Sequence, residues 1–276
     1  MTDFVLRAEA VTKDYVVGRN LLGKPSRVVQ AVRGVSLSIA AGSTLALVGE
    51  SGSGKSTLGR CIAGLVRPSS GRIHLAGHDV LQLAGPSLMS FRRQVQTIFQ
   101  DPYSSLNPRR TVGHAIMDGM AIHKLYGAEE RWARMLALLV RVGLHPDHAK
   151  RFPHQFSGGQ RQRIAIARAL ALAPRFIVAD EAVSALDVSV KAQVLDLLAD
   201  LQEEHGLTYL FISHDLGVVR HFADRVAIMS AGELVEEGEC DQIFEAPRHE
   251  YTRGLIAAVP RPDPARRRLR QAPAWR

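Results

Sequence analysis

The segment that most constrains the fold is G-E-S-G-S-G-K-S, residues 49–56. It follows a short apolar run at residues 44–48 and precedes a stretch in which Leu58, Ile62 and Leu65 recur at helical spacing. This is the pattern G-x-x-x-x-G-K-[ST] in the strand, loop and helix context that the pattern requires. Its glycines let successive backbone N–H groups surround phosphate oxygens, and the helix start adds a favourable field. The segment therefore predicts a polyphosphate-binding loop in an α/β fold.

Two side chains of this loop have expected roles. Lys55 is expected to contact the β- and γ-phosphates, and Ser56 to hold Mg²⁺. A glycine-rich turn without a ligand is the alternative, and the flanking strand and helix argue against it.

Strand and helix patterns alternate along most of the chain. Apolar runs at residues 176–179 and 207–212 read as buried strands. Between them, Val190, Val194, Leu197 and Leu201 recur at helical spacing, and Gly206 supplies a C-terminal stop. This order predicts a mainly parallel sheet covered by helices.

Two regions depart from that alternation. Residues 100–165 lose the strand signal and are expected to form an inserted helical subdomain, which begins in the turn-rich stretch F-Q-D-P-Y-S-S-L-N-P-R-R (residues 99–110). One helix there is expected to carry a single apolar stripe of Trp132, Met135, Leu136, Leu139 and Val140. The first 40 residues are expected to form a small antiparallel element on the edge of the sheet.

Composition excludes several classes of protein. With 276 residues the chain can bury a large core, and its two cysteines, Cys61 and Cys240, lack the spacing of a disulfide framework or zinc site. A reducing, cytosolic setting fits. No apolar run of 18 residues and no secretory leader are recognised, so no membrane-spanning helix is expected.

The net charge of +8 is concentrated at one end. Residues 261–276 contain six arginines and one aspartate, which supply +5 of it. A solvated basic tail is expected, with an acidic partner or lipid head groups as the alternative. No aromatic and basic platform accompanies the tail, so nucleic acid is not an expected partner.

Polar residues at two strand ends suggest the reaction. Asp180 and Glu181 follow the run at 176–179, where Asp180 is expected to bind Mg²⁺ through water and Glu181 to orient or deprotonate an attacking water. His214 follows the next strand, either as a hydrogen-bonded structural residue or as a ligand-facing group at the edge where such sheets bind ligands.

A second glycine-rich segment, F-S-G-G-Q (residues 156–160), opens a helix. Ser157 is a candidate N-cap, and the glycines free backbone N–H groups at the positive helix end. A simple glycine-rich cap is the alternative. One chain with two phosphate-binding ends suggests that nucleotide is held between two chains.

The ordered set G-E-S-G-S-G-K-S-T, Gln100, F-S-G-G-Q, V-A-D-E, S-A-L-D and I-S-H-D resembles the ATP-binding subunits of ABC transporters over nearly the whole chain. Two segments are similar to those of the oligopeptide and dipeptide importers: Q-D-P-Y-S-S-L-N-P-R and P-R-H-E-Y-T-R-G-L-I-A-A-V-P. Nickel and glutathione importers share much of both segments. The resemblance implies a RecA-like P-loop NTPase core with an N-terminal antiparallel β subdomain and an inserted α-helical subdomain. It also implies one ATPase domain over residues 1–260, followed by the tail.

The same resemblance assigns roles by position. Glu181 is the implied catalytic base, His214 a γ-phosphate contact, Tyr15 the adenine-stacking ring and Asp187 a link between two sites. Gln100 is expected to reach Mg²⁺ and the attacking water, with Ser56 and Asp180 as the other metal-binding residues. The phosphates are expected to be wrapped by Gly49, Glu50, Ser51, Gly52, Ser53, Gly54, Lys55, Ser56 and Thr57. The γ-phosphate on the opposite subunit is expected to be held by Ser157, Gly158, Gly159 and Gln160.

Three positions depart from the family pattern. Phe156 replaces the usual leucine and should still pack behind its loop. Ala182 replaces the proline that follows the catalytic glutamate, which is expected to loosen the backbone at Glu181. Glu250 replaces a proline of the peptide importers, which weakens only the subfamily assignment.

The implied function is ATP hydrolysis that drives an importer of di- or oligopeptides, with nickel, glutathione or another small solute as alternative cargo. Expected partners are a related but different ATPase chain, two permeases and an extracytoplasmic substrate-binding protein, with the chain peripheral at the cytoplasmic face of the inner membrane. A soluble ABC ATPase acting on ribosomes or DNA is the alternative of another class. It is disfavoured because such proteins generally carry two ATPase units or long coiled-coil insertions.

Overall fold

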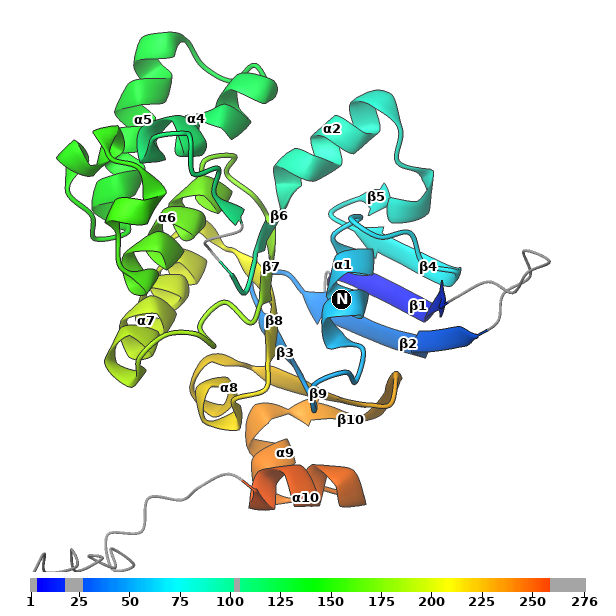
Figure 1. The fold of residues 1–276 in the computed structure, drawn as a ribbon. Helices are drawn as coiled ribbons and strands as arrows, with labels where there is room; N and C mark the ends of the chain where they lie inside the picture. Colours follow the sequence, from blue (N-terminus) through cyan, green and yellow to red (C-terminus); the bar gives the residue numbers. More distant parts are fainter. Residues whose placement is uncertain (1–3, 18–26, 102–104, 259–276) are drawn as a thin grey trace, which may run out of the picture.

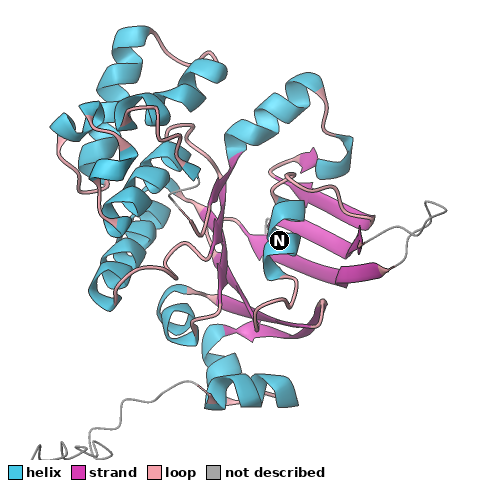
Figure 2. Cartoon of the chain, in the orientation of Figure 1, coloured by secondary structure: helices cyan, strands magenta, loops and turns pink. Residues whose placement is uncertain are grey.

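The computed structural model describes residues 4–17, 27–101 and 105–258 of the chain. The basic tail at 261–276 and residues 102–104 of the turn-rich stretch lie outside these residues. Two sheets with helices packed around them form the described part (Figures 1 and 2).

The larger sheet has six strands in the order β10-β9-β3-β8-β7-β6. Neighbouring strands from β9 to β6 are parallel, and β10 pairs with β9 in the antiparallel direction. Its strands are β3 (Thr44–Val48), β6 (Val95–Ile98), β7 (Phe176–Asp180), β8 (Thr208–Ser213), β9 (Arg225–Ser230) and β10 (Glu233–Glu239). The predicted mainly parallel α/β core is therefore confirmed.

The smaller sheet is antiparallel, in the order β2-β1-β4-β5. Its strands are β1 (Phe4–Val16), β2 (Val28–Ala40), β4 (Ser70–Leu75) and β5 (His78–Asp79). The antiparallel subdomain was expected, but its expected place on the edge of the parallel sheet is wrong. It is a separate sheet that lies beside helix α1 (Figure 1). Its buried side chains pack with α1 and with one face of the larger sheet in a common core.

Helices cover both faces of the larger sheet (Figure 2). The α-helices are α1 (Lys55–Ile62), α2 (Gly85–Gln94), α4 (Val112–Ile122), α5 (Ala128–Arg141), α6 (Gly158–Leu170), α7 (Val188–His205), α8 (Leu216–Phe222), α9 (Cys240–Glu245) and α10 (Glu250–Ala257). Short 3₁₀ helices are η1 (Val80–Gln82), η2 (Pro146–Lys150) and η3 (Pro153–Gln155).

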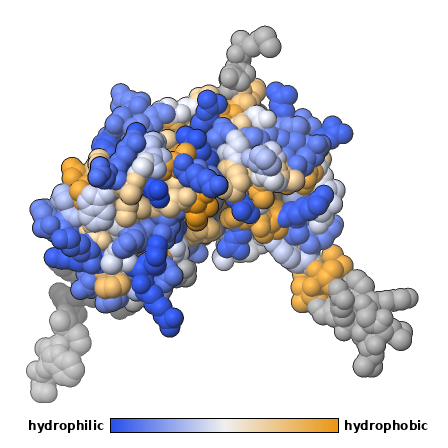
Figure 3. Space-filling model, turned by 90° about the horizontal axis from the view of Figure 1, so that it is seen from above, coloured by the Kyte–Doolittle hydropathy of each residue, from blue (hydrophilic) through white to orange (hydrophobic). Residues whose placement is uncertain are grey.

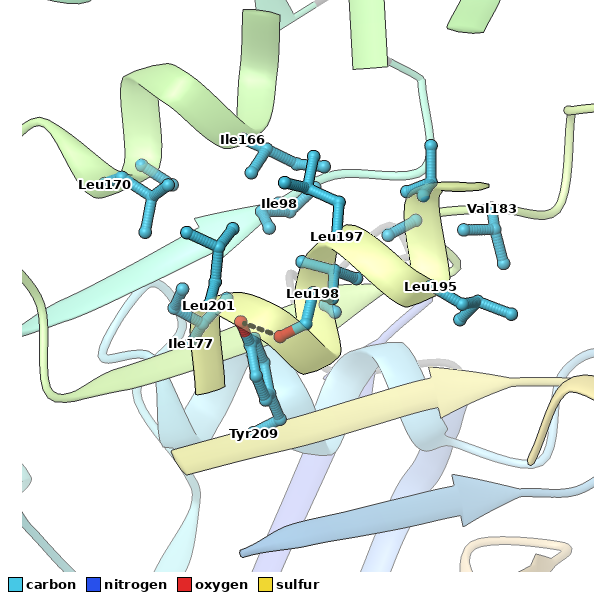
Figure 4. Packing of buried hydrophobic residues seen from close by; sticks show 14 of the residues in the cluster. Ile98, Ile166, Leu170, Ile177, Val183, Leu195, Leu197, Leu198, Leu201 and Tyr209 are labelled. Carbon is cyan, nitrogen blue, oxygen red and sulfur yellow. Dashed lines mark hydrogen bonds between the residues drawn. The ribbon is translucent and has the colours of Figure 1, made fainter. Parts of the chain in front are cut away.

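Alternation along the parallel strands divides the apolar residues between two cores. In β8, Leu210 and Ile212 face α1 and the antiparallel sheet, whereas Tyr209 and Phe211 face the helices on the opposite side. Figure 4 shows this second core, where the Tyr209 hydroxyl donates to the Leu198 carbonyl of α7 at 3.1 Å. The sheet is therefore anchored on both faces, which holds the ends of its strands in fixed positions.

Two predicted apolar faces end earlier than expected. Helix α1 stops at Ile62 because Gly64 has a φ of +66°, and Leu65, which was expected on its buried face, is 55% exposed. On α5, Met135 and Leu139 are buried, but Val140 is 59% exposed, and Trp132 is exposed as well. The inward stripe of α5 is therefore narrower than the apolar spacing indicated.

The segment between β6 and β7 is helical. Its described residues contain α4, α5, η2, η3 and α6 and no strand. Figure 1 shows these helices together at one side of the larger sheet. Within the described ranges, no helix combines the length and the hydropathy that crossing a bilayer requires.

Candidate active site

Four parallel strands end at one edge of the sheet and supply the candidate site. The glycine-rich loop follows β3, and Gln100, Glu181 and His214 come after β6, β7 and β8. The pocket between them has a volume of about 570 Å³. It is lined by Ala31, Ser51, Gly52, Gly54, Lys55, Ser56, Thr57, Gln100, Glu181 and His214. Residues between positions 31 and 214, far apart in sequence, thus share one concave surface, as expected at the carboxyl edge of such a sheet.

Two glycines give the loop its shape because nothing larger fits. Gly54 has a φ of +102°, and a Cβ there would lie 2.1 Å from the Ala31 carbonyl oxygen of β2. A Cβ at Gly49 would lie 2.1 Å from the Met229 carbonyl oxygen of β9. The loop is therefore packed between both sheets before any ligand contacts it.

Lys55 is the buried cation of the pocket, at 4% exposure. Its Nζ donates to the carbonyl oxygens of Gly49 and Glu50, each at 2.8 Å. Burial lowers its pKa, whereas the carboxylates of Glu181 and Asp180 act in the opposite direction. The loop carbonyls are neutral acceptors for this charged amine, whereas a phosphate would be an anionic partner.

Ser56 and Asp180 form the candidate magnesium site. The Ser56 hydroxyl donates to Asp180 Oδ1 at 2.7 Å, and Asp180 is 5% exposed. Burial raises the pKa of Asp180, which the hydrogen bond from Ser56 partly offsets. Hydroxyl and carboxylate oxygens suit Mg²⁺, which keeps several waters and adds phosphate oxygens, so these two residues fit the ion. Gln100, the third predicted metal residue, instead bonds to Glu181.

Glu181 is the centre of the polar cluster. Gln100 Nε2 donates to Glu181 Oε2 at 2.9 Å, and His214 Nδ1 lies 3.3 Å from the same oxygen. The Glu181 side chain is 16% exposed, and its φ of +51° is unusual for a residue with a side chain. Such strain costs on the order of 1 kcal/mol and persists where surrounding structure holds it.

Hydrogen bonds after Glu181 hold that strained turn. The Ser184 N–H and hydroxyl both donate to the Glu181 carbonyl oxygen, at 3.1 and 3.0 Å, and the Glu181 N–H donates to the Ile212 carbonyl at 3.0 Å. Ala182 is 2% exposed in the main core. The expected loosening by Ala182 is therefore opposed by three hydrogen bonds to the Glu181 backbone.

His214 lies in the short turn between β8 and α8. The next residue, Asp215, accepts from the Gly217 N–H at 3.1 Å as the N-cap of α8, and Lys191 of α7 pairs with it at 3.1 Å. The sequence left open whether His214 is structural or faces a ligand. His214 lines the pocket, and its side chain is 55% exposed, which favours the second role.

The second glycine-rich segment starts α6, as predicted. Ser157 Oγ accepts from the Gln160 N–H at 3.3 Å, and Gln160 Oε1 accepts from the Ser157 N–H at 3.1 Å, which completes a capping box. A Cβ at Gly159 would meet Val190 of α7 at 2.5 Å. Phe156 is 4% exposed in the main core, so it does pack behind the loop.

Several predicted site residues lie outside the pocket of this chain. The predicted site residues absent from its lining are the four signature residues, Tyr15, Asp187, Asp180, Gly49, Glu50 and Ser53. Tyr15 is 38% exposed on β1, with Lys13 Nζ 5.1 Å from its ring centre, and Asp187 is an exposed residue at the start of α7. The roles assigned to these residues remain predictions.

Two residues near the loop were not predicted. Ala31 lines the pocket from β2, and the Tyr251 hydroxyl of α10 accepts from the Glu50 N–H at 3.0 Å. Ala31 carries no sequence signal. Tyr251 belongs to the run H-E-Y-T-R-G-L, which indicated a subfamily and no position in the fold.

Comparison with known proteins shows two family matches. Residues 32–184 match the family described as ABC transporter, and residues 235–274 match the family described as oligopeptide/dipeptide transporter, C-terminal region.

The chain is also similar to curated relatives named glutathione import ATP-binding protein GsiA. That of Pectobacterium atrosepticum is 49% identical over 97% of this chain, and that of Escherichia coli O157:H7 is 51% identical over 96%. The chain spans only 43% and 42% of the length of these two relatives.

Solved structures agree with this assignment. A dimeric ATP-binding cassette, MJ0796, bound to ADP and Pi aligns with a TM-score of 0.76 at 32% identity, over 85% of this chain and 98% of that one. CbiO1 of Clostridium perfringens, described as part of the ABC transporter complex cbiONQ, aligns with a TM-score of 0.74 at 28% identity, over 88% and 92%. The predicted P-loop NTPase fold is thus confirmed, and the chain belongs to the ABC transporter family as one of its ATP-binding cassettes.

Proposed function

We propose that the chain hydrolyses ATP to ADP and phosphate and that this reaction drives solute import through partner permeases. The observation that carries the proposal is the shared oxygen of Glu181, which Gln100 and His214 both contact at the wall of the phosphate-loop pocket. A carboxylate held in this way is suited to accept a proton from an attacking water. Because phosphoryl transfer depends mostly on positioning and electrostatics, few further groups are needed.

The predicted site residues have distinct roles in this mechanism. The N–H groups of the loop hold the phosphates at the start of α1, and Lys55 exchanges its carbonyl partners for β- and γ-oxygens. Ser56 and Asp180, with Gln100 in a closed state, hold Mg²⁺, which supplies positive charge to the phosphates when bound. Glu181 orients the water and accepts its proton, and His214 contacts the γ-phosphate. Tyr15 stacks on adenine.

We propose that two ATPase chains close on the nucleotides. Ser157, Gly158, Gly159 and Gln160 bind the γ-phosphate of the opposite chain, and Asp187 connects the two sites. Support comes from the capped N-terminus of α6, which lies outside the pocket of its own chain, and from the similarity to a cassette described as dimeric. A related but different chain is the proposed partner.

The proposed permease contact is a groove of about 540 Å³ between α2, β6 and α4. Its lining includes Leu65, Met89 and Ile122, which are 55%, 37% and 65% exposed. Figure 3 looks down on this end of the molecule and shows apolar side chains near the middle of the face, with more polar surface on both sides. An apolar segment of a permease would cover these side chains. In this proposal the chain is a peripheral subunit at the cytoplasmic face of the inner membrane.

A small peptide is the proposed cargo, delivered by an extracytoplasmic substrate-binding protein. The C-terminal match at residues 235–274 favours peptides, and the relatives' name favours glutathione, which is itself a tripeptide. Nickel or another small solute is the alternative. The same C-terminal match argues against a soluble ABC ATPase acting on ribosomes or DNA.

We also propose that residues 1–260 act as one ATPase domain. The helices of residues 100–165 would form a subdomain inserted in this domain. The basic tail at 261–276 would come after the domain in sequence.

The direct test reconstitutes the chain with co-expressed permeases and binding protein in vesicles and follows phosphate release with Mg·ATP. Glutathione, a dipeptide and Ni²⁺ are each added with the binding protein. Stimulation by glutathione or the dipeptide is the expected result. Stimulation by Ni²⁺ alone would identify nickel as the cargo in place of a peptide. The absence of phosphate release under every condition would contradict the proposed ATP hydrolysis.

A further inference from the structure

Beyond the residues that line the pocket, one hydrogen bond joins the two parts of the chain that match different families. The Glu50 N–H of the phosphate loop donates to the Tyr251 hydroxyl of α10 at 3.0 Å. Glu50 belongs to the ABC transporter match at 32–184, and Tyr251 to the C-terminal match at 235–274. The bond spans 201 positions in sequence, so it exists only because the C-terminal helix returns to the loop.

The bond acts on a particular peptide group. The Gly49–Glu50 peptide donates its N–H to Tyr251, and its carbonyl oxygen accepts from Lys55 Nζ at 2.8 Å. One planar unit is thus held at both ends, by the C-terminal helix and by the phosphate-binding lysine. Rotation of this peptide would move the carbonyl that orients Lys55.

The helix that carries Tyr251 is itself firmly attached. Glu236 of β10 accepts from the N–H groups of Arg248 and His249, at 2.8 and 3.0 Å, just before α10 begins. His249 Nδ1 accepts from the Tyr251 N–H at 3.2 Å as the N-cap. The half-buried Tyr251 ring packs against the main core. A hydroxyl fixed through a sheet and a capped helix can restrain a loop, whereas a mobile one would follow it.

We infer that Tyr251 is a positioning residue for nucleotide binding: its hydroxyl holds the Gly49–Glu50 peptide so that the phosphate loop and Lys55 are arranged before the nucleotide arrives. A loop arranged in advance loses less conformational freedom on binding, and the gain appears as affinity. The inference rests on the proposed ATPase function and assigns the C-terminal region a role inside the chain's own nucleotide site.

Removing only the hydroxyl provides the test. Tyr251→Phe in the full chain keeps the ring and its packing, and a lost hydrogen bond of this kind corresponds to about two- to tenfold weaker binding. We expect the Kd for Mg·ADP and the KM for ATP to rise by this factor, with kcat changed less than twofold and Tm nearly unchanged. Glu236→Ala, which frees the start of α10, should raise the same Kd.

Tyr209→Phe is the matched control, because its hydroxyl also donates one bond, to the Leu198 carbonyl in the core. It should lower Tm and leave the Kd for Mg·ADP unchanged. Tyr251→Phe with wild-type affinity, or with a lower Tm as its only effect, would overturn the inference. Failure of the wild-type chain to bind Mg·ADP would instead contradict the proposed function, so the two failures are distinguishable.

Discussion

His214 Nδ1 lies 3.3 Å from Glu181 Oε2, the oxygen to which Gln100 Nε2 also donates at 2.9 Å. These three side chains follow three different parallel strands, β8, β7 and β6. One carboxylate oxygen of Glu181 therefore links residues from three strand ends. Substituting Gln100 or His214 should therefore change the activity of the Glu181 carboxylate while leaving the carboxylate itself in place.

Replacing Gln100 with alanine should lower cargo-stimulated ATP hydrolysis more than nucleotide affinity. Gln100 bonds to Glu181 and has no bond to the phosphate loop among the described contacts, so it acts on the attacking water and less on the bound phosphates. The measurement compares kcat and the Kd for Mg·ADP in the reconstituted complex. Gln82→Ala, on the antiparallel subdomain, is the control and should change neither quantity. An equal loss of kcat and of Mg·ADP affinity for Gln100→Ala would mean that Gln100 contributes to nucleotide binding in general and has no particular role at the attacking water.

Replacing His214 with alanine should lower kcat about 100-fold or more, the usual range for a positioned polar group in the reaction. The KM for ATP should change less than threefold, because the loop and Lys55 still bind the phosphates. His221→Ala, an exposed histidine on α8, should keep wild-type kcat. A His214→Ala chain with wild-type kcat would assign this histidine to the structural role that the sequence left open.

Asp180→Asn should stabilise the ligand-free chain at neutral pH while abolishing Mg²⁺-dependent hydrolysis. Burial raises the pKa of Asp180, so its charged form is disfavoured in the folded state, and the amide can still accept from Ser56. Each kcal/mol gained should raise Tm by about 2–4 °C.

The pH dependence follows from the direction of that shift. A raised pKa means that the folded chain takes up a proton at a higher pH than the unfolded chain does, so wild-type stability improves as pH falls through the raised pKa toward about 3.9. The difference in Tm between Asp180→Asn and wild type should therefore narrow on acidification. A difference that is constant or widens toward low pH would contradict the assignment.

The two glycines of the signature should behave differently. A Cβ at Gly159 would meet Val190 at 2.5 Å, whereas one at Gly158 would meet only Leu186, at 3.9 Å. Gly159→Ala should destabilise the single chain by about 1–3 kcal/mol, as overpacking generally does. Gly158→Ala should leave Tm unchanged and lower hydrolysis, because its effect arises only against the opposite chain. Thermal unfolding and phosphate release separate the two, and a large fall in Tm for Gly158→Ala would contradict this account.

The sequence predicted those features that depend on one strand or loop. The phosphate loop, the strand ends at Asp180 and His214, and the Ser157 cap all follow local patterns, and the structure has them at the predicted residues. Contacts between distant elements could not be predicted. The pairing of Gln100 with Glu181 and the bond from Glu50 to Tyr251 depend on how strands and helices pack, which no local pattern contains. The antiparallel sheet was predicted, but its position was predicted wrongly for the same reason, because its burial against α1 is a tertiary effect.

The most direct test of the central claim is Glu181→Gln, with Glu130→Gln on α5 as the control. The amide keeps the size of the side chain and cannot accept the proton of the attacking water. We predict that phosphate release from ATP is lost, that Mg·ATP binding is retained, and that Mg·ATP produces a stable dimer, with a second copy or with the partner ATPase. Phosphate release at the wild-type rate would contradict the claim that Glu181 is the catalytic base.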